Sequence, residues 1–163
     1  MNTQAIKQSI KQAMLASLDD EITTALAAAG EAQATASHAD NKPENQYDTL
    51  ALEAAYLAHG QSERILQLQK TRIDVARWPV PDLDGAAIRL GACVHLESYT
   101  DGTEEWVFIA PFGGRRLQVD ENSILVVSHE APLARQLAGL CVDDEVRLTL
   151  GGKEGNWAVV RVF

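Results

Sequence analysis

The sequence has few cysteines and no long apolar run. Cys93 and Cys141 are the two cysteines among 163 residues, and they do not form a CxxC pair. One disulfide is conceivable, but two reduced, partly buried thiols in a cytoplasmic protein are the expectation. No apolar stretch approaches the roughly 20 residues that a bilayer span needs. The amino-terminal MNTQAIKQSIKQ lacks the apolar core of a signal peptide. We therefore expect a soluble, cytoplasmic protein without a membrane partner.

Basic residues are also scarce. The chain has 14 basic and 23 acidic residues, which gives a net charge of -9. Nucleic-acid-binding domains attract phosphates through a basic surface, so this balance argues against independent DNA binding. A hydrophobic fraction of 46% is typical of a globular protein. The length suits one ordinary domain or two small ones.

The first half of the sequence indicates two long helices. Between Thr3 and Ser37 there is no proline, and Gly30 is the one glycine. Apolar and small residues recur there at spacings of three and four, which is a heptad pattern. Ile6, Ile10 and Met14 widen this stripe, whereas Lys7 and Lys11 suit the solvent side. From Glu44 to about Ile73 a second stripe faces the first. The two sets are Leu15, Leu18, Ile22, Ala25, Ala29, Ala32 and Ala36, and Leu50, Ala54, Leu57, Gln61, Ile65 and Leu68.

Residues 38–47, HADNKPENQY, form the polar tip segment between the two helices. Pro43 cannot lie inside a helix without losing a backbone hydrogen bond, and it pushes Lys42 out of the α region. The sequence therefore predicts an antiparallel, coiled-coil hairpin over residues 1–77. Asp40 and Glu44 are hard oxygen ligands that suit magnesium. Acids near a helix start also favour the helix dipole, so both interpretations stay open.

The second half of the sequence indicates a small strand domain. Pro79 and Pro81 predict a stiff linker over residues 78–84. From residue 85 to 163 apolar residues alternate with polar ones, as in half-buried strands. Ala131 to Gly139 indicates one short helix, with Pro132 in its first turn. The predicted fold class is α+β, a helical hairpin followed by mostly antiparallel strands. The expected strands are 92–97, 105–110, 115–119, 124–127, 146–150 and 157–163.

Motifs of hydrolytic, phosphate-binding or metal chemistry are missing. The four histidines share no metal-ligand spacing. Ser128 and Ser62 lack the setting of a nucleophile elbow. The Gly-Gly pairs at 113–114 and 151–152 are explained by tight turns, because they lack the strand-to-helix context of a phosphate site.

Two segments resemble the Gre transcript-cleavage factors, GreA and GreB. The tip segment follows the pattern Asp-x-Lys-x-Glu-Asn-x-Tyr. Ser128 to Leu140 is similar to the family's Ser-Pro-Ile-Ala-Arg-x-Leu-x-Gly segment. The resemblance extends from about residue 15 to 163. The residues that carry it are Asp40, Lys42, Glu44, Asn45 and Tyr47 in the tip segment, and Pro132, Leu133, Ala134, Arg135, Leu137 and Gly139 in the second segment.

The resemblance implies an accessory factor rather than an enzyme. The strand domain would be FKBP-like and would dock on bacterial RNA polymerase. The hairpin would enter the polymerase secondary channel, where Asp40 and Glu44 would help to hold a shared catalytic magnesium. The chain would have no metal or cofactor of its own, and it would meet nascent RNA only inside the polymerase complex. Lys42, Asn45 and Tyr47 would support the tip, and Pro132, Leu133, Ala134, Arg135 and Leu137 would contact the polymerase.

Basic hairpin residues of the family face the transcript, and here the candidates are Lys7, Lys11, Lys42 and Arg64. The tip departs from the family in one respect. Family tips place the two acids three residues apart, whereas Asp40 and Glu44 are four apart with Pro43 inserted.

Three alternatives to a cleavage factor stay open. The first is a secondary-channel regulator that binds polymerase without cleavage. The second is an FKBP-like peptidyl-prolyl isomerase, and the third is a coiled-coil interaction protein with no role at polymerase.

Overall fold

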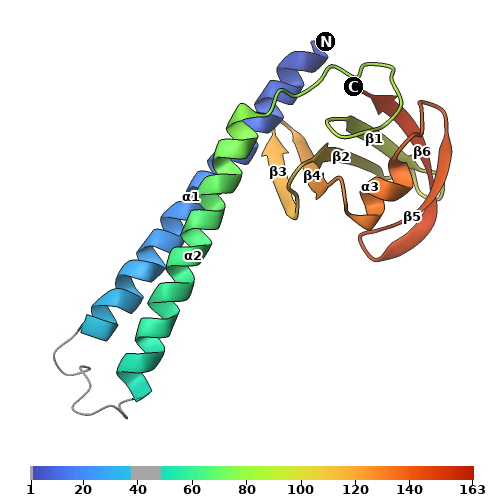
Figure 1. Ribbon diagram of the computed structural model, residues 1–163. Helices are drawn as coiled ribbons and strands as arrows, with labels where there is room; N and C mark the ends of the chain where they lie inside the picture. Colours follow the sequence, from blue (N-terminus) through green and yellow to red (C-terminus); the bar gives the residue numbers. More distant parts are fainter. Residues whose placement is uncertain (1, 38–48) are drawn as a thin grey trace. The chain divides into compact units, whose positions relative to one another are not determined.

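The computed structural model describes residues 2–37 and 49–163, and it omits the side chains of 32, 33, 35–37 and 49–59 (Figure 1). The chain divides into two compact units. One unit, the arm, comprises Leu15–Arg77. The other, the strand unit, comprises Met1–Met14 together with Trp78–Phe163.

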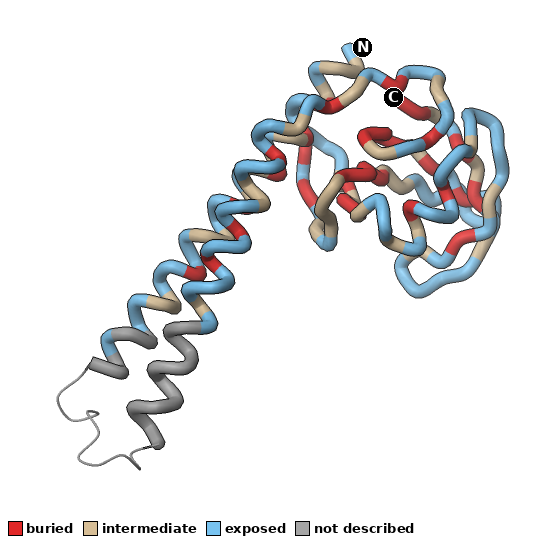
Figure 2. The backbone as a smooth tube through the Cα atoms, in the orientation of Figure 1, coloured by how far each residue is buried: buried red, intermediate tan, exposed pale blue. Residues whose placement is uncertain are grey.

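The arm is an antiparallel pair of helices. Helix α1 spans Thr3–Ser37, of which the part from Leu15 onward belongs to the arm, and α2 spans Thr49–Arg77. Apolar residues recur as buried positions along both helices, and Figure 2 colours the buried residues of the backbone red. Two ion pairs join the helices in opposite sequence order, Asp19 with Arg72 and Glu21 with Arg64. The buried set is Leu18, Ala25, Ile65, Leu68 and Val75.

The strand unit contains a six-stranded sheet with the strand order β3-β4-β2-β1-β6-β5. The β2–β4 pair is parallel, and the other four pairs are antiparallel. With the short helix α3 at Pro132–Leu137, the predicted α+β fold class is confirmed. The strands are β1 Cys93–Ser98, β2 Glu104–Ala110, β3 Arg115–Val119, β4 Asn122–Ser128, β5 Glu145–Leu150 and β6 Lys153–Val162.

Strand β6 begins four residues earlier than the alternation predicted. The turn before it uses Gly151 and Gly152, both with positive φ angles of 61° and 78°. Only glycine adopts this conformation without a steric cost. Because these two residues complete the reversal, Lys153 already pairs with Leu150.

One face of the sheet forms the main core with α3. The side chains of Ala134 and Leu137 are buried against strand residues that alternate along the chain. This cluster explains why α3 is retained although it is only six residues long. Its strand members include Val94, Leu96, Val107, Ile109, Leu148, Trp157, Val159 and Val162.

The other face of the sheet carries aromatic side chains. The imidazole of His95 stacks on Trp106, with ring centroids 4.2 Å apart and planes 4° apart. Phe108 contacts Trp78 at 5.7 Å, and the edge of Trp106 meets Phe163 at 6.1 Å. The free thiol of Cys93 is buried on this face, whereas Cys141 is free and exposed.

The first fourteen residues differ from the expected domain division. The sequence assigned residues 1–77 to the hairpin, but residues up to Met14 belong to the strand unit. Ile10 and Met14 are buried. Their apolar stripe continues the heptad pattern of the arm. Such a pattern predicts that one face of the helix is buried, but it does not predict which part of the chain packs on that face.

Three side chains of α1 donate hydrogen bonds to the backbone of the segment that follows α2. Gln4 Nε2 lies 3.3 Å from the Val80 carbonyl oxygen, Lys7 Nζ 2.5 Å from that of Pro81, and Lys11 Nζ 2.7 Å from that of Trp78. These donors are three and four residues apart, so they share one helix face. Lys7 is fully buried, which contradicts its assignment to the solvent side.

The expected linker over residues 78–84 is a packed part of the strand unit. Val80 and Leu83 are buried. The amide of Gly85 donates to the carbonyl of Val162 at 3.1 Å. Gly91 lies so close to the ring of Pro81 that an added Cβ would collide with it. The two prolines therefore fix a folded connection rather than a spacer.

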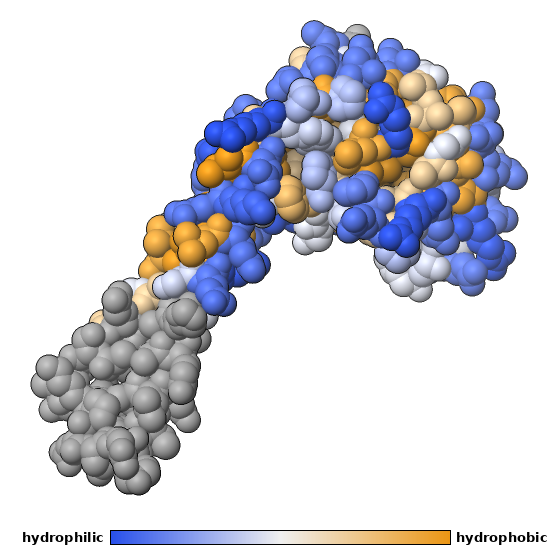
Figure 3. All heavy atoms as spheres, in the orientation of Figure 1, coloured by the Kyte–Doolittle hydropathy of each residue, from blue (hydrophilic) through white to orange (hydrophobic). Residues whose placement is uncertain are grey.

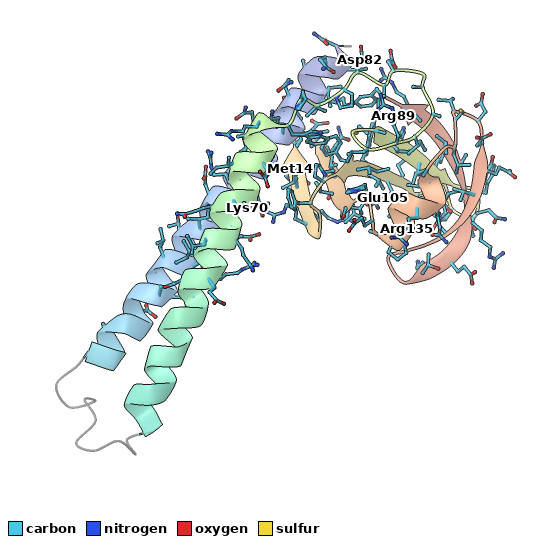
Figure 4. The ribbon with its side chains drawn as sticks, in the orientation of Figure 1. Met14, Lys70, Asp82, Arg89, Glu105 and Arg135 are labelled. Atoms are coloured by element: carbon cyan, nitrogen blue, oxygen red, sulfur yellow. The ribbon has the colours of Figure 1, made fainter. Side chains whose placement is uncertain are left out.

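Burial lowers the pKa of Lys7 and raises the pKa of Cys93. Desolvation lowers the pKa of Lys7 from 10.5 to about 8, and the weaker attraction of the Asp82 carboxylate does not offset it. Figure 4 labels Asp82 and Arg89, the latter of which also lowers this pKa. Desolvation raises the pKa of Cys93 to about 12, so that the thiol stays protonated.

Lys7→Met should remove a rise in stability with pH. Between pH values of about 8 and 10.5 the unfolded chain binds more protons at Lys7 than the folded chain, so unfolding becomes harder as pH rises. Cys93 acts oppositely above about pH 9, because the folded thiol keeps a proton that the unfolded thiol loses. Urea unfolding at about pH 7.5 and pH 9 measures the difference.

The matched control is Lys11→Met, which removes another lysine of the same helix face. In Lys11→Met the free energy of unfolding should still rise with pH as it does in the unmodified chain. An identical pH dependence in Lys7→Met and the unmodified chain would show that Lys7 is not desolvated as described.

Candidate functional site

The five predicted tip residues lie outside the described residues. They are Asp40, Lys42, Glu44, Asn45 and Tyr47. Their roles therefore remain predictions from the sequence. What the structure describes is the arm that leads to them, because α1 ends at Ser37 and α2 begins at Thr49 on the same end of the antiparallel pair.

A bidentate ion pair between Asp19 and Arg72 fixes the register of α1 against α2. Arg72 Nε lies 2.5 Å from Asp19 Oδ1, and Arg72 Nη2 lies 3.2 Å from Asp19 Oδ2. The hydrogen bond from Arg72 lowers the pKa of Asp19, and the same bond raises the pKa of Arg72. Both side chains are exposed to solvent, so the pair adds geometric specificity more than stability.

The opposite side of the arm is grooved. Arg64 Nη2 lies 3.5 Å from Glu21 Oε2 across a hollow of about 560 Å³. Small side chains at Ala25 and Ala28 leave this space between the helices.

Three of the four predicted basic candidates have partners within their own unit. Arg64 pairs with Glu21, and Lys7 and Lys11 donate hydrogen bonds to backbone carbonyls of the strand unit. Lys42 lies outside the described residues.

Apolar side chains are exposed on the arm. The exposed fractions are 52% for Leu26, 66% for Leu66 and 48% for Ile73. Leu66 and Ile73 are seven residues apart, so they lie on one face of α2. Figure 3 shows apolar surface on the described part of the arm. Such side chains suit contact with a protein surface.

The predicted polymerase-binding segment is helix α3, and it has an inner and an outer side. Ala134 and Leu137 are buried in the core. Pro132 and Arg135 are exposed, and Leu133 is half-buried. Figure 4 labels Arg135 on this helix. Of the five predicted residues, Pro132, Leu133 and Arg135 can therefore offer side-chain surface to a partner, whereas Ala134 and Leu137 position the helix.

A cavity of about 290 Å³ opens on the strand unit, and it was not predicted from the sequence. Leu125, Leu150 and Trp157 line it, and Arg116 Nη1 bonds to Glu105 Oε1 at 2.7 Å on its rim. The lining residues come from all six strands and two turns, so no local motif marks the cavity. Trp157 is the one aromatic residue that lines it. This is a weak match to the aromatic-lined pocket that prolyl isomerase activity needs.

Across residues 2–37 and 49–163, no three His, Cys, Asp or Glu side chains are placed to hold a metal ion. In the same part of the chain, neither long helix is apolar enough over a sufficient length to cross a bilayer.

Leu137→Ala and Arg135→Ala should separate the inner and outer sides of α3. Leu137→Ala leaves a cavity in the core, so it should lower the free energy of unfolding by about 2–5 kcal/mol. Arg135→Ala changes an exposed side chain and should alter it by about 0.5 kcal/mol or less. Urea unfolding followed by circular dichroism measures both. Equal losses in the two variants would contradict the orientation of α3 described above.

No protein-family model matches this chain, and no curated protein matches it. Three similar solved structures are the GreA factor homolog Gfh1 of Thermus thermophilus, Gfh1 of Thermus aquaticus and the elongation factor GreA/GreB from Nitrosomonas europaea. Their sequence identities are 19%, 18% and 20%, and their TM-scores are 0.40, 0.39 and 0.34. The matches cover 91%, 93% and 62% of this chain and 94%, 94% and 90% of those chains.

Proposed function

We propose that this chain is a Gre-like transcription elongation factor that binds bacterial RNA polymerase and stimulates its cleavage of backtracked RNA. The observation that carries the proposal is the arm. Two paired helices, held by buried residues and two ion pairs, connect through a segment whose sequence resembles the family's acidic tip. An arm of this kind can carry two carboxylates into a channel that a compact domain could not enter.

The strand unit supplies the proposed anchor. The exposed Pro132 and Arg135 of α3 lie in the second segment that resembles the family. An arginine and a proline on a helix whose inner side is locked into the core form a rigid contact surface. A protein partner also accommodates the acidic net charge of the chain, which a nucleic-acid partner would not.

The chemistry proposed for the tip is hydrolysis by the polymerase itself. Asp40 and Glu44 are carboxylates, which suit magnesium, an ion that takes one or two protein carboxylates and keeps several waters. When bound, a second catalytic magnesium would stabilise the attacking and leaving oxygens of the hydrolysis. The role of this chain would be to position the two carboxylates beside the ion. It would hold no ion without the polymerase.

The spacing of the acids sets the expected efficiency. Asp40 and Glu44 are separated by one residue more than in the family pattern, with Pro43 between them. A displacement of about 1 Å in a catalytic group can cost on the order of a hundredfold in rate. A secondary-channel regulator that binds without cleavage is therefore the alternative to be tested, and it would use the same docking surfaces.

A backtracked elongation complex tests the proposal. Adding the chain should produce shortened transcripts, and either Asp40→Ala or Glu44→Ala should reduce the cleavage rate by about tenfold or more while binding is kept. Deletion of Pro43 restores the family spacing and should raise the rate, by up to about a hundredfold. Transcripts resolved on a sequencing gel give the rates, and co-purification with polymerase gives binding.

Asp20→Ala is the matched control, because it removes an exposed carboxylate from the described part of the arm. It should leave cleavage unchanged. Binding to polymerase without cleavage, before and after deletion of Pro43, would favour the regulator. Failure to bind polymerase would leave the coiled-coil interaction protein, and activity on a proline peptide would favour the isomerase.

A further inference from the structure

We propose that a cavity inside the strand unit is a binding site for a small single-ring aromatic ammonium compound. The cavity measures about 260 Å³ and lies between the first turns of α1 and the aromatic face of the sheet. It is independent of the arm, so the proposal does not rest on the proposed function. The lining residues are Ile6, Cys93, Trp106, Val119, Asp120, Asn122 and Ile124.

The walls of the cavity are apolar and held in place. Val119, Ile124 and Cys93 are buried side chains of three strands, and Ile6 approaches from α1. Burial raises the pKa of Cys93 to about 12, so the thiol offers an uncharged surface. Apolar cavities of this kind are poor sites for water, and an engineered one of about 150 Å³ binds benzene. The present volume accommodates one ring with a short substituent.

Trp106 provides a flat wall for an aromatic ring. Its indole is stacked on His95 and meets Phe163 edge-on, so two neighbours restrict its rotation. Aromatic rings prefer offset-stacked or edge-to-face contacts with one another, and such contacts add stabilisation beyond the area they bury. A fixed indole beside a ring-sized space therefore favours an aromatic ligand over an aliphatic one.

The rim of the cavity adds a negative charge. A two-residue turn joins Val119 to Asn122, and Asp120 occupies it with a positive φ of 53°. Within the described part of the chain, no side chain pairs with the Asp120 carboxylate. Lys7, the residue after Ile6, directs its ammonium group to the Pro81 carbonyl instead. A carboxylate only accepts hydrogen bonds, so it selects an ammonium or another donor on the ligand.

Benzylammonium is the probe that combines a single ring with such a donor. Titrated into the full chain, it should bind one site saturably, with a dissociation constant in about the millimolar range for a ligand of this size. The indole N–H signal of Trp106 in a proton–nitrogen NMR spectrum should shift, and Trp106→Phe identifies that signal among the three tryptophans. Benzyl alcohol, which is similar in shape and neutral, should bind more weakly.

Asp120→Asn tests the charge without disturbing the turn, because asparagine tolerates a positive φ. It should weaken benzylammonium about two- to fivefold and leave benzyl alcohol unchanged. The matched control is Asp143→Asn, which changes the other aspartate with a positive φ, 74°, and should affect neither probe. Ile6→Trp should fill the cavity from the helix side and abolish binding of both.

Three results would overturn the proposal. One is the absence of a saturable shift at Trp106 up to about 30 mM benzylammonium. Another is equal affinity for the two probes in the unmodified chain. The third is full binding by Ile6→Trp once its circular dichroism spectrum has shown that it is folded.

Discussion

The burial of a few apolar side chains between α1 and α2 is the interaction on which the arm depends. Isolated helices are marginal in water, because helix nucleation is costly and propensity alone seldom offsets it. Each large side chain that is fully buried contributes about 1.5–3 kcal/mol, and the exposed ion pairs of the arm contribute less than about 1 kcal/mol each. Leu18, Ile65 and Leu68 therefore hold the helices together, while Asp19 and Arg72 select one register.

Helix α1 serves both units of the chain. From Leu15 onward it pairs with α2, whereas its first fourteen residues complete the strand unit. There the helix uses apolar side chains against the sheet and three polar side chains against backbone carbonyls. The burial of Lys7 has a desolvation cost, which its lowered pKa reflects. The ammonium groups of Lys7 and Lys11 donate hydrogen bonds to the carbonyl groups of Pro81 and Trp78. Backbone carbonyls that are shielded from water need such donors.

The sequence predicted regular elements well and tertiary partners less well. The apolar run EWVFIA and the glycine pairs at turns are local signals, so the strands were identified within a few residues. The stripe of Ile10 and Met14 was assigned to the hairpin because heptad spacing does not identify the covering surface. Lys7 was assigned to solvent because a buried lysine needs a carbonyl that is distant in sequence. The cavities could not be predicted from the sequence for the same reason, since their walls come from several strands.

Distances between spin labels on the arm test the central claim, the antiparallel pairing of α1 with α2, most directly. Cys141→Ser removes the exposed thiol, and the buried Cys93 stays unreactive. Labels are then placed at the exposed positions Leu26 and Leu66, or Leu26 and Ile73, and measured by pulsed electron paramagnetic resonance. Antiparallel pairing predicts a narrow distribution for each pair and a shorter distance for Leu26–Leu66, because seven residues extend a helix by about 10 Å. Broad distributions, or a shorter Leu26–Ile73 distance, would contradict the account.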